Sequence, residues 1–580
     1  MTSLHRPEPK QTNPMAKYGP IAAVLVVIAV IAGVSISKRG SSTDQATTEG
    51  TGGGGTGTNP DIPVIFADAK KAGGNLADYG ERCDQATGRI KMPSLFAPPC
   101  VPAHKAGTDN GGATSKGVTK DKITIVQYKA STNGDLSALL QGLLDTPEAS
   151  AATWKAYVNM FNELYETYGR KVEIVDFQSQ GAMDDEVAGK ADAIKIAEEL
   201  NAFAVIGGPA LAQSYAVELK ERGVLCIGCG QGVPDSTYQK LAPYVWGAQA
   251  TPEQFLLNLA DLITGRLNGK NAEFAGDPEM RNRKRVFGVV HFEQKVPVYK
   301  ELEEQVKQAG QDRGYETAVT ETYVLDLAKL GERATTIVAK MKEANVTSVI
   351  FLGDPLMPMQ LTRAATEQNY FPEWIVTGTV LTDTNVFGRR YDPKQWSHAF
   401  GISSLPAKMP REQGDGWRLH QWFYDDAEPA AKTTGPIIYA GIQLAFLGIH
   451  MAGPKLSPTT FRDGMFNYPP TGGGVTSPQV SFGDHGFFTN PVTKTSSPDY
   501  LGIDDVALVW WDPEAEGPDE SGVVAKGLYR YIDNGARYLP GKMPKTDLPV
   551  GKVENTVTIL DEVPASERPP TYPSPKRQVP

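Results

Sequence analysis

The chain has 580 residues, of which 40% are hydrophobic and 21% are charged, a composition typical of globular domains. This length is enough for two or three hydrophobic cores of roughly 100–200 residues each. The 57 basic and 67 acidic residues give a formal net charge of −10. The charge excludes the dense basic face that nucleic-acid binding requires, so we expect no nucleic-acid partner.

An uncharged apolar segment near the N-terminus predicts the compartment. Residues 21–36 contain no charged side chain, and three basic residues precede them. With residues 1–18 as a cytoplasmic tail, residues 19–37 are long enough to cross a bilayer as one helix of about 20 residues. The preceding basic residues favour a single-pass plasma-membrane protein whose main domain is extracytoplasmic. A cleaved signal peptide, which would release a secreted protein, is the alternative, since Ser35 and Ser37 are small enough for a cleavage site.

Two segments with little apolar periodicity follow. Residues 38–60 are rich in Gly, Thr and Ser, which predicts a flexible linker. Residues 61–117 form an N-terminal extension in which Cys83 and Cys100 bracket a Pro-rich stretch. The chain has four cysteines, and an even number in an exported protein predicts two disulfides. We therefore expect a bridge between Cys83 and Cys100.

From residue 118 onward, predicted strands alternate with amphipathic helices. The strands of a first unit are predicted at residues 123–128, 171–177, 203–208 and 224–228. Those of a second unit are predicted at residues 285–292, 316–324, 347–354 and 373–378. This alternation predicts the α/β class, with mostly parallel sheets flanked by helices. We expect a two-lobed domain over residues 118–545, with lobe one at about 118–248 and lobe two at about 249–380.

Later segments are expected to be shared between the lobes. An apolar helix is predicted at residues 435–453 and a strand at 506–512. Residues 546–580 form a Pro-rich tail. Because it is rich in Pro, Glu and Lys from Pro549 onward, we expect it to be disordered.

Three stretches carry a resemblance to a known family. They read FAVIGGPALAQSYAVELKERGVLCIGCGQGVPD, RVFGVVHFEQKVPVYKELEEQVKQAG and ATTIVAKMKEANVTSVIFLGDPLMPMQLTRAATEQNY. In this order they resemble the type I periplasmic-binding fold of branched-chain amino-acid-binding proteins. The later run VALVWWDPEAEGPDESG resembles a membrane-anchored actinobacterial subgroup of these proteins.

The resemblance implies that a solute binds between the lobes, at loops that follow the carboxyl ends of strands. The matching positions of lobe one are Tyr128, Lys129, Gly208, Pro209, Ala210, Gln213, Gln231 and Gly232. Those of lobe two are Gln294, Tyr299, Asp354, Thr377 and Thr379. The hydroxyl residues with which amino-acid-binding members hold an α-amino acid are missing from these loops except for Ser214. We therefore expect a different, bulkier or less charged solute.

The resemblance also implies a function without catalysis, namely capture of a small organic solute for an ABC importer whose permease and ATPase subunits are separate chains. A ligand-sensing ectodomain of an envelope signalling system is the first alternative. A thiol-disulfide oxidoreductase that uses Cys226 and Cys229 is the second. We expect an inert or structural pair there, because Cys226 lies in a predicted strand and not at a helix N-terminus. We also expect no metal or cofactor, since the sequence has no phosphate-loop motif and no metal-binding histidine spacing.

Overall fold

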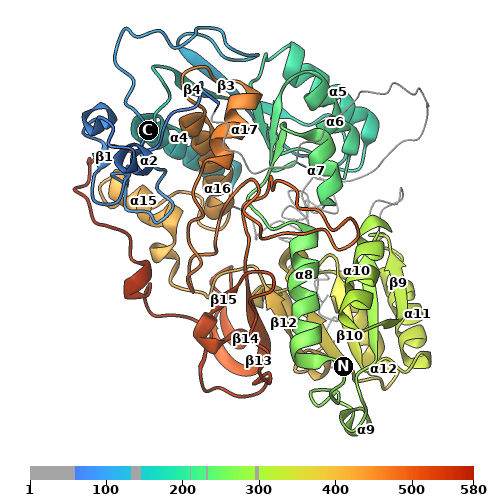
Figure 1. Ribbon diagram of the computed structural model, residues 1–580. Helices are drawn as coiled ribbons and strands as arrows, with labels where there is room; N and C mark the ends of the chain where they lie inside the picture. Colours follow the sequence, from blue (N-terminus) through green and yellow to red (C-terminus); the bar gives the residue numbers. More distant parts are fainter. Residues whose placement is uncertain (1–58, 132–144, 210, 230–232, 294–299) are drawn as a thin grey trace, which may run out of the picture.

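The computed structural model describes residues 59–131, 145–209, 211–229, 233–293 and 300–580, which form two lobes joined side by side (Figure 1). The predicted membrane-spanning segment at residues 19–37 lies outside the described residues, as does nearly all of the predicted linker. The expected α/β class is confirmed, because each lobe is built on a parallel sheet flanked by helices.

Lobe one contains a five-stranded sheet in the order β4-β3-β5-β6-β7, with every neighbouring pair parallel. Its strands are β3 (Lys122–Lys129), β4 (Lys171–Gln178), β5 (Ala204–Ile206), β6 (Leu225–Ile227) and β7 (Val245–Trp246). Its helices are α4 (Pro147–Leu164), α5 (Glu186–Glu198), α6 (Gln213–Glu221) and α7 (Asp235–Leu241). The short central strands β5 and β6 are almost entirely buried, which is why they read as continuous apolar runs.

Lobe two contains a larger sheet in the order β16-β14-β13-β12-β11-β10-β8-β9. Five strands are mutually parallel: β8 (Phe287–Phe292), β9 (Thr317–Tyr323), β10 (Ser348–Leu352), β11 (Glu373–Val376) and β12 (Ala399–Ser403). The antiparallel part comprises β13 (Val506–Pro518), β14 (Val524–Ile532), β15 (Arg537–Tyr538) and β16 (Thr556–Val557). The flanking helices are α8 (Pro252–Leu262), α9 (Pro278–Arg281), α10 (Lys300–Arg313), α11 (Leu330–Glu343), α12 (Met357–Glu367), α13 (Asn385–Gly388) and α14 (Pro393–Trp396).

Before the tail, the chain passes between the lobes three times. It enters lobe two after β7, returns to lobe one after β12, and enters lobe two again before β13. The returning segment forms α15 (Asp415–Phe423), α16 (Gly435–Ala452) and α17 (Pro458–Phe466). Among the described residues, α16 alone is long and apolar enough to cross a membrane, but 72% of it is buried inside the protein. It is therefore a core helix of lobe one, as its apolar sequence predicts.

The N-terminal extension packs on lobe one through α2 (Phe66–Lys71) and the hairpin of β1 (Cys83–Asp84) with β2 (Arg89–Ile90). The expected disulfide between Cys83 and Cys100 is confirmed, and both residues are buried in a small cluster with Phe66 and Tyr79. The bridge fixes a stretch that has little regular secondary structure.

The prediction that the tail is disordered from Pro549 onward is wrong. In Figure 1 the tail runs from lobe two back to lobe one, where the chain ends. Strand β16 pairs with β14, the buried Glu567 carboxylate accepts hydrogen bonds from Val475, Thr476 and Ser477, and Tyr572 donates to Asp84. The composition suggested disorder because the tail has no core of its own, but these side chains anchor it to the rest of the protein.

Candidate interlobe binding site

The two parallel sheets share one strand order. Counted along the chain, the strands of each lobe lie in the order second, first, third, fourth, fifth. The connections after the first and third strands leave toward opposite faces, so a crevice opens at the carboxyl ends of these two strands. In lobe one this point lies between β3 and β5, and in lobe two between β8 and β10.

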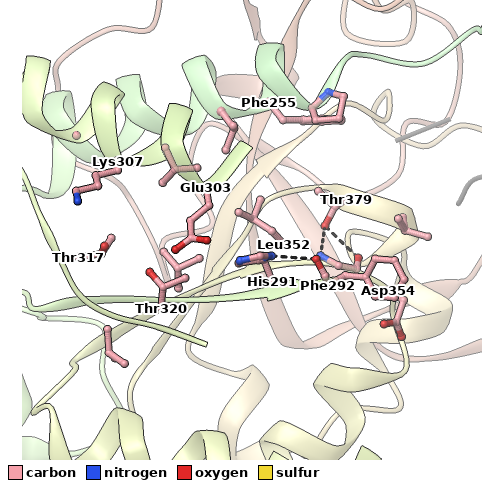
Figure 2. Close-up of a pocket in the computed structure, with 18 of the residues that line it drawn as sticks. Phe255, His291, Phe292, Glu303, Lys307, Thr317, Thr320, Leu352, Asp354 and Thr379 are labelled. Atoms are coloured by element: carbon pink, nitrogen blue, oxygen red, sulfur yellow. Dashed lines mark hydrogen bonds between the residues drawn. The ribbon is translucent and has the colours of Figure 1, made fainter. Parts of the chain in front are cut away.

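A cavity of about 460 Å³ in lobe two reaches this point and extends beneath α10 to the start of β9 (Figure 2). Its lining comes from α8, β8, α10 and β9, and from the loops that follow β10 and β11. Leu211, in the loop between β5 and α6, adds a contribution from lobe one. The cavity therefore lies in lobe two with one lining residue from lobe one, and its volume is in the range of about 300–1,000 Å³ that is typical of small-molecule sites.

Most of the cavity wall is apolar. Helix α8 supplies Phe255 and Leu256, β8 supplies Val289, and α10 supplies Val306. Strand alternation explains the contribution of β8, because Phe287, Val289 and His291 point to the face covered by α8 and α10. A solute in this space would be surrounded mainly by hydrocarbon.

His291 is the polar side chain that β8 adds to this wall. The side chain is only 7% exposed, and its Nδ1 lies 2.9 Å from the Phe292 carbonyl oxygen. A carbonyl oxygen can only accept, so Nδ1 carries the hydrogen, and Nε2 of the neutral ring is an acceptor. Nε2 is buried and has no hydrogen-bond partner. In Figure 2 this edge of the ring turns away from Phe292 and toward the side of the cavity where Glu303 and Thr320 are drawn.

Asp354 lines the cavity, but its carboxylate is held by the protein itself. Oδ1 accepts hydrogen bonds from the backbone N–H groups of Leu356 and Met357 at the start of α12, at 2.8 and 3.1 Å, and Oδ2 accepts from the Tyr323 hydroxyl. Burial raises the pKa of Asp354, although these hydrogen bonds oppose the shift. The carboxylate therefore caps a helix and positions Tyr323. Its predicted contact with a solute stays a prediction.

The two predicted threonines differ in position. Thr379 lines the cavity, and its hydroxyl bonds to the backbone of Gly353 at 3.0 and 3.1 Å. Thr377 is 1% exposed and donates to the Phe351 carbonyl, so its hydroxyl lies behind the cavity wall. Together they tie the loop after β11 to the loop after β10.

The predicted residues of lobe one lie mainly in packing positions. Tyr128 is buried, donates to Asp192 at 2.8 Å and contacts the ring of Tyr215. A Cβ at Gly208 would come within 2.6 Å of the Tyr215 ring, so glycine is required there by packing. Lys129 forms an ion pair with Asp176, Pro209 packs near Gly189, and Gln213 is the buried first residue of α6.

The N-terminus of α6, which directly follows the loop with Leu211, is also occupied. The Glu186 carboxylate accepts hydrogen bonds from the backbone N–H groups of Gln213 and Ser214 at 3.1 and 2.8 Å. A helix N-terminus is a natural anion site. Here a carboxylate of the protein fills it, as Asp354 does at α12.

The remaining predicted residues lie outside the described parts of the chain: Ala210, Gln231, Gly232, Gln294 and Tyr299. The sequence analysis did not identify His291, Leu211 or Phe255. For His291 a signal was present, because it lies near the carboxyl end of the first strand of lobe two, where such a fold binds ligands. Leu211 and Phe255 have no signal that separates them from core residues.

Cys226 and Cys229 form a disulfide, as expected for four paired cysteines. Cys226 is 0% exposed and Cys229 is 5% exposed. Thiol-disulfide exchange requires access of an attacking thiolate to a sulfur, so this buried pair is a structural bridge. Within the described ranges, no group of three or more His, Cys, Asp or Glu side chains could hold a metal ion.

No protein-family model and no curated protein matches this chain. Among solved structures, it is similar to a solute-binding protein of an ABC transporter from Rhodopseudomonas palustris in complex with 3,4-dihydroxybenzoic acid (13% identity, 73% of this chain, 99% of that chain, TM-score 0.46). It is also similar to a leucine-, isoleucine-, valine-, threonine- and alanine-binding protein from Brucella ovis (13% identity, 76% of this chain, 100% of that chain, TM-score 0.47). A third similar structure is that of a periplasmic binding protein type 1 from Bordetella pertussis (12% identity, 70% of this chain, 99% of that chain, TM-score 0.43).

The chain has two lobes, and the parallel part of each sheet has the same strand order. This architecture agrees with the two-lobed α/β fold that the sequence resemblance predicts. The identities and TM-scores are too low for any ligand of these proteins to be assigned to this chain. The cavity therefore has to be interpreted from its own residues.

Proposed function

We propose that this protein captures a small organic solute between its lobes and delivers it to an ABC importer formed by separate permease and ATPase chains. The observation that carries the proposal is the cavity at the strand ends of lobe two, to which Leu211 of lobe one contributes. A solute there contacts both lobes, so its binding favours the closed arrangement over the open one. The N-terminal apolar segment would hold the protein at the outer face of the plasma membrane.

Capture without chemistry fits the lining. The polar groups of Thr379 and Asp354 are engaged in internal hydrogen bonds, and the charged side chains of Glu303 and Lys307 are exposed on α10. Such a wall can enclose a solute and fix its orientation. It offers few groups for proton transfer or nucleophilic attack, which catalysis by side chains requires.

A thermal-shift screen of small metabolites on the full-length chain tests the proposal. A solute at 100 times its Kd should stabilise the protein by about 3 kcal/mol, because only the folded state binds it. Leu211→Trp places a large ring in the cavity and should abolish the response. Val217→Trp, at a residue of α6 that is 45% exposed, is the matched control and should keep it. A response that survives Leu211→Trp would place the solute elsewhere and contradict the proposed function.

A further inference from the structure

Two helix N-termini beside the cavity, those of α6 and α12, bear on the charge of the solute. The first N–H groups of α6 are bonded to Glu186, and those of α12 are bonded to Asp354. These are the backbone groups that would receive a solute carboxylate or phosphate at a helix N-terminus. Both sets are already occupied by carboxylates of the protein, so these two helix N-termini are not free to receive an anionic solute.

The side chains of the cavity wall offer no buried cation in their place. Among the described lining residues, Lys307 is the one lysine or arginine, and it is exposed on α10 one turn from the exposed Glu303. An exposed ammonium in water contributes little to holding an anion. The deeper wall, formed by residues such as Phe255, Val289 and Leu352, is apolar.

Among the described residues of the wall, Nε2 of His291 is the one fully buried side-chain nitrogen or oxygen without a hydrogen-bond partner. Nε2 of His291 is buried, faces the cavity, and is an acceptor without a partner because Nδ1 donates to the Phe292 carbonyl. A buried acceptor without a partner is unfavourable, and a donor on a bound molecule removes that cost. We propose that the solute is uncharged and largely apolar, and that it carries a hydroxyl group that donates a hydrogen bond to Nε2 of His291. This inference rests on the proposed function and adds the chemical class of the solute.

Three biphenyls of nearly equal shape test it by calorimetric titration of the full-length chain. 4-Hydroxybiphenyl offers a donor, 4-methoxybiphenyl offers none, and biphenyl-4-carboxylate carries a negative charge. The hydroxyl compound should bind about five- to hundredfold more tightly than the methoxy compound, as expected for a buried hydrogen bond made or missing. The carboxylate should bind most weakly.

Variants at His291 assign the preference to one atom. His291→Phe keeps a ring without an acceptor and should make the hydroxyl and methoxy compounds bind equally. His291→Gln supplies an amide oxygen and should keep part of the preference. His398→Phe alters a histidine that does not line the cavity and is the matched control, with the wild-type preference expected. Urea midpoints close to that of the wild type establish that each variant is folded.

The outcomes separate this inference from the function on which it rests. Equal binding of the hydroxyl and methoxy compounds to the wild type, or a preference that survives His291→Phe, would overturn the solute class. Tightest binding of the carboxylate would also overturn it. If no biphenyl binds but the metabolite screen finds a solute whose response Leu211→Trp abolishes, the solute class is wrong and solute capture stands. If neither experiment finds a ligand, both proposals fail.

Discussion

Glu253 makes the stability of the protein depend on pH. It lies in the first turn of α8 and is 0% exposed. Its Oε1 accepts from the backbone N–H of Asp235 in lobe one at 2.9 Å and from the Gln305 side chain of α10 at 3.1 Å, whereas Oε2 has no partner. Burial, assisted by the nearby Asp235 carboxylate, raises the pKa of Glu253 to about 8. The folded protein therefore holds the neutral acid at pH 7.

The sign of the effect follows from the two pKa values. In the unfolded chain the pKa is near 4.5, so between pH 4.5 and 8 the folded state binds a proton that the unfolded state has lost. The contribution of Glu253 to the free energy of unfolding is fully present below pH 4.5 and is lost as the pH rises through 8. At about 1.4 kcal/mol for each pH unit, the loss amounts to about 4 to 5 kcal/mol at most.

Glu253→Gln isolates this contribution, because the amide keeps the Oε1 acceptor and does not titrate. Between pH 5 and pH 8.5 the free energy of unfolding should fall by about 4 kcal/mol less in the variant than in the wild type. Urea unfolding at both pH values measures the difference. Burial also raises the pKa of Asp504 to about 7 and that of Asp383 to about 6, but these groups act equally in both proteins. Equal losses in the variant and the wild type would refute the reasoning.

Two further predictions concern buried carboxylates. Glu373→Gln breaks an ion pair between fully buried side chains, in which Arg285 donates two hydrogen bonds of 2.8 Å to Glu373. Urea unfolding should show that the variant loses about 3 to 5 kcal/mol of stability. Glu343→Gln, at an exposed residue, should leave the stability unchanged, and an unchanged stability in Glu373→Gln would contradict the stabilising role of the pair. Glu567→Ala removes four hydrogen bonds of 2.7 to 2.8 Å that anchor the tail. Limited proteolysis should therefore cut this variant after residue 549 much faster than it cuts the wild type or the control variant Glu562→Ala, which alters an exposed residue. Equal cutting rates would show that other contacts hold the tail.

Much of the fold could be predicted because its strands are buried on both faces and its helices show apolar periodicity. The prediction for residues 285–292 matches β8 within two residues, and that for 435–453 matches α16 within one. Strand β12 (Ala399–Ser403) and helix α15 were missed. The first is only five residues long, and the second combines buried aromatic side chains with polar neighbours.

The candidate site could be predicted only in outline. The sequence placed the ligand at the strand ends between the lobes, but of the predicted residues that the structure describes, Asp354 and Thr379 alone line the cavity. Whether a polar side chain is free to bind a solute or is bonded to a helix N-terminus depends on partners far away in the chain. Glu186 caps α6 from 27 residues away, and Asp354 is held by Tyr323 from 31 residues away. Contacts of this kind leave no local pattern in a single sequence.

The tail constrains how the lobes can move. It is attached to lobe two by β16 and to the segment between α17 and β13 by Glu567. It is attached to lobe one by the hydrogen bonds of Tyr572 with Asp84 and Trp422 and by the ion pair of Arg577 with Glu163. That ion pair is about half exposed, so it contributes little and can break when the lobes separate. The buried Glu567 contacts are far harder to lose. In Figure 1 the tail rises along the left side from lobe two to lobe one, whereas α10 and β9 of the cavity lie on the right. We therefore expect the tail to restrain separation of the lobes more on its own side than at the cavity.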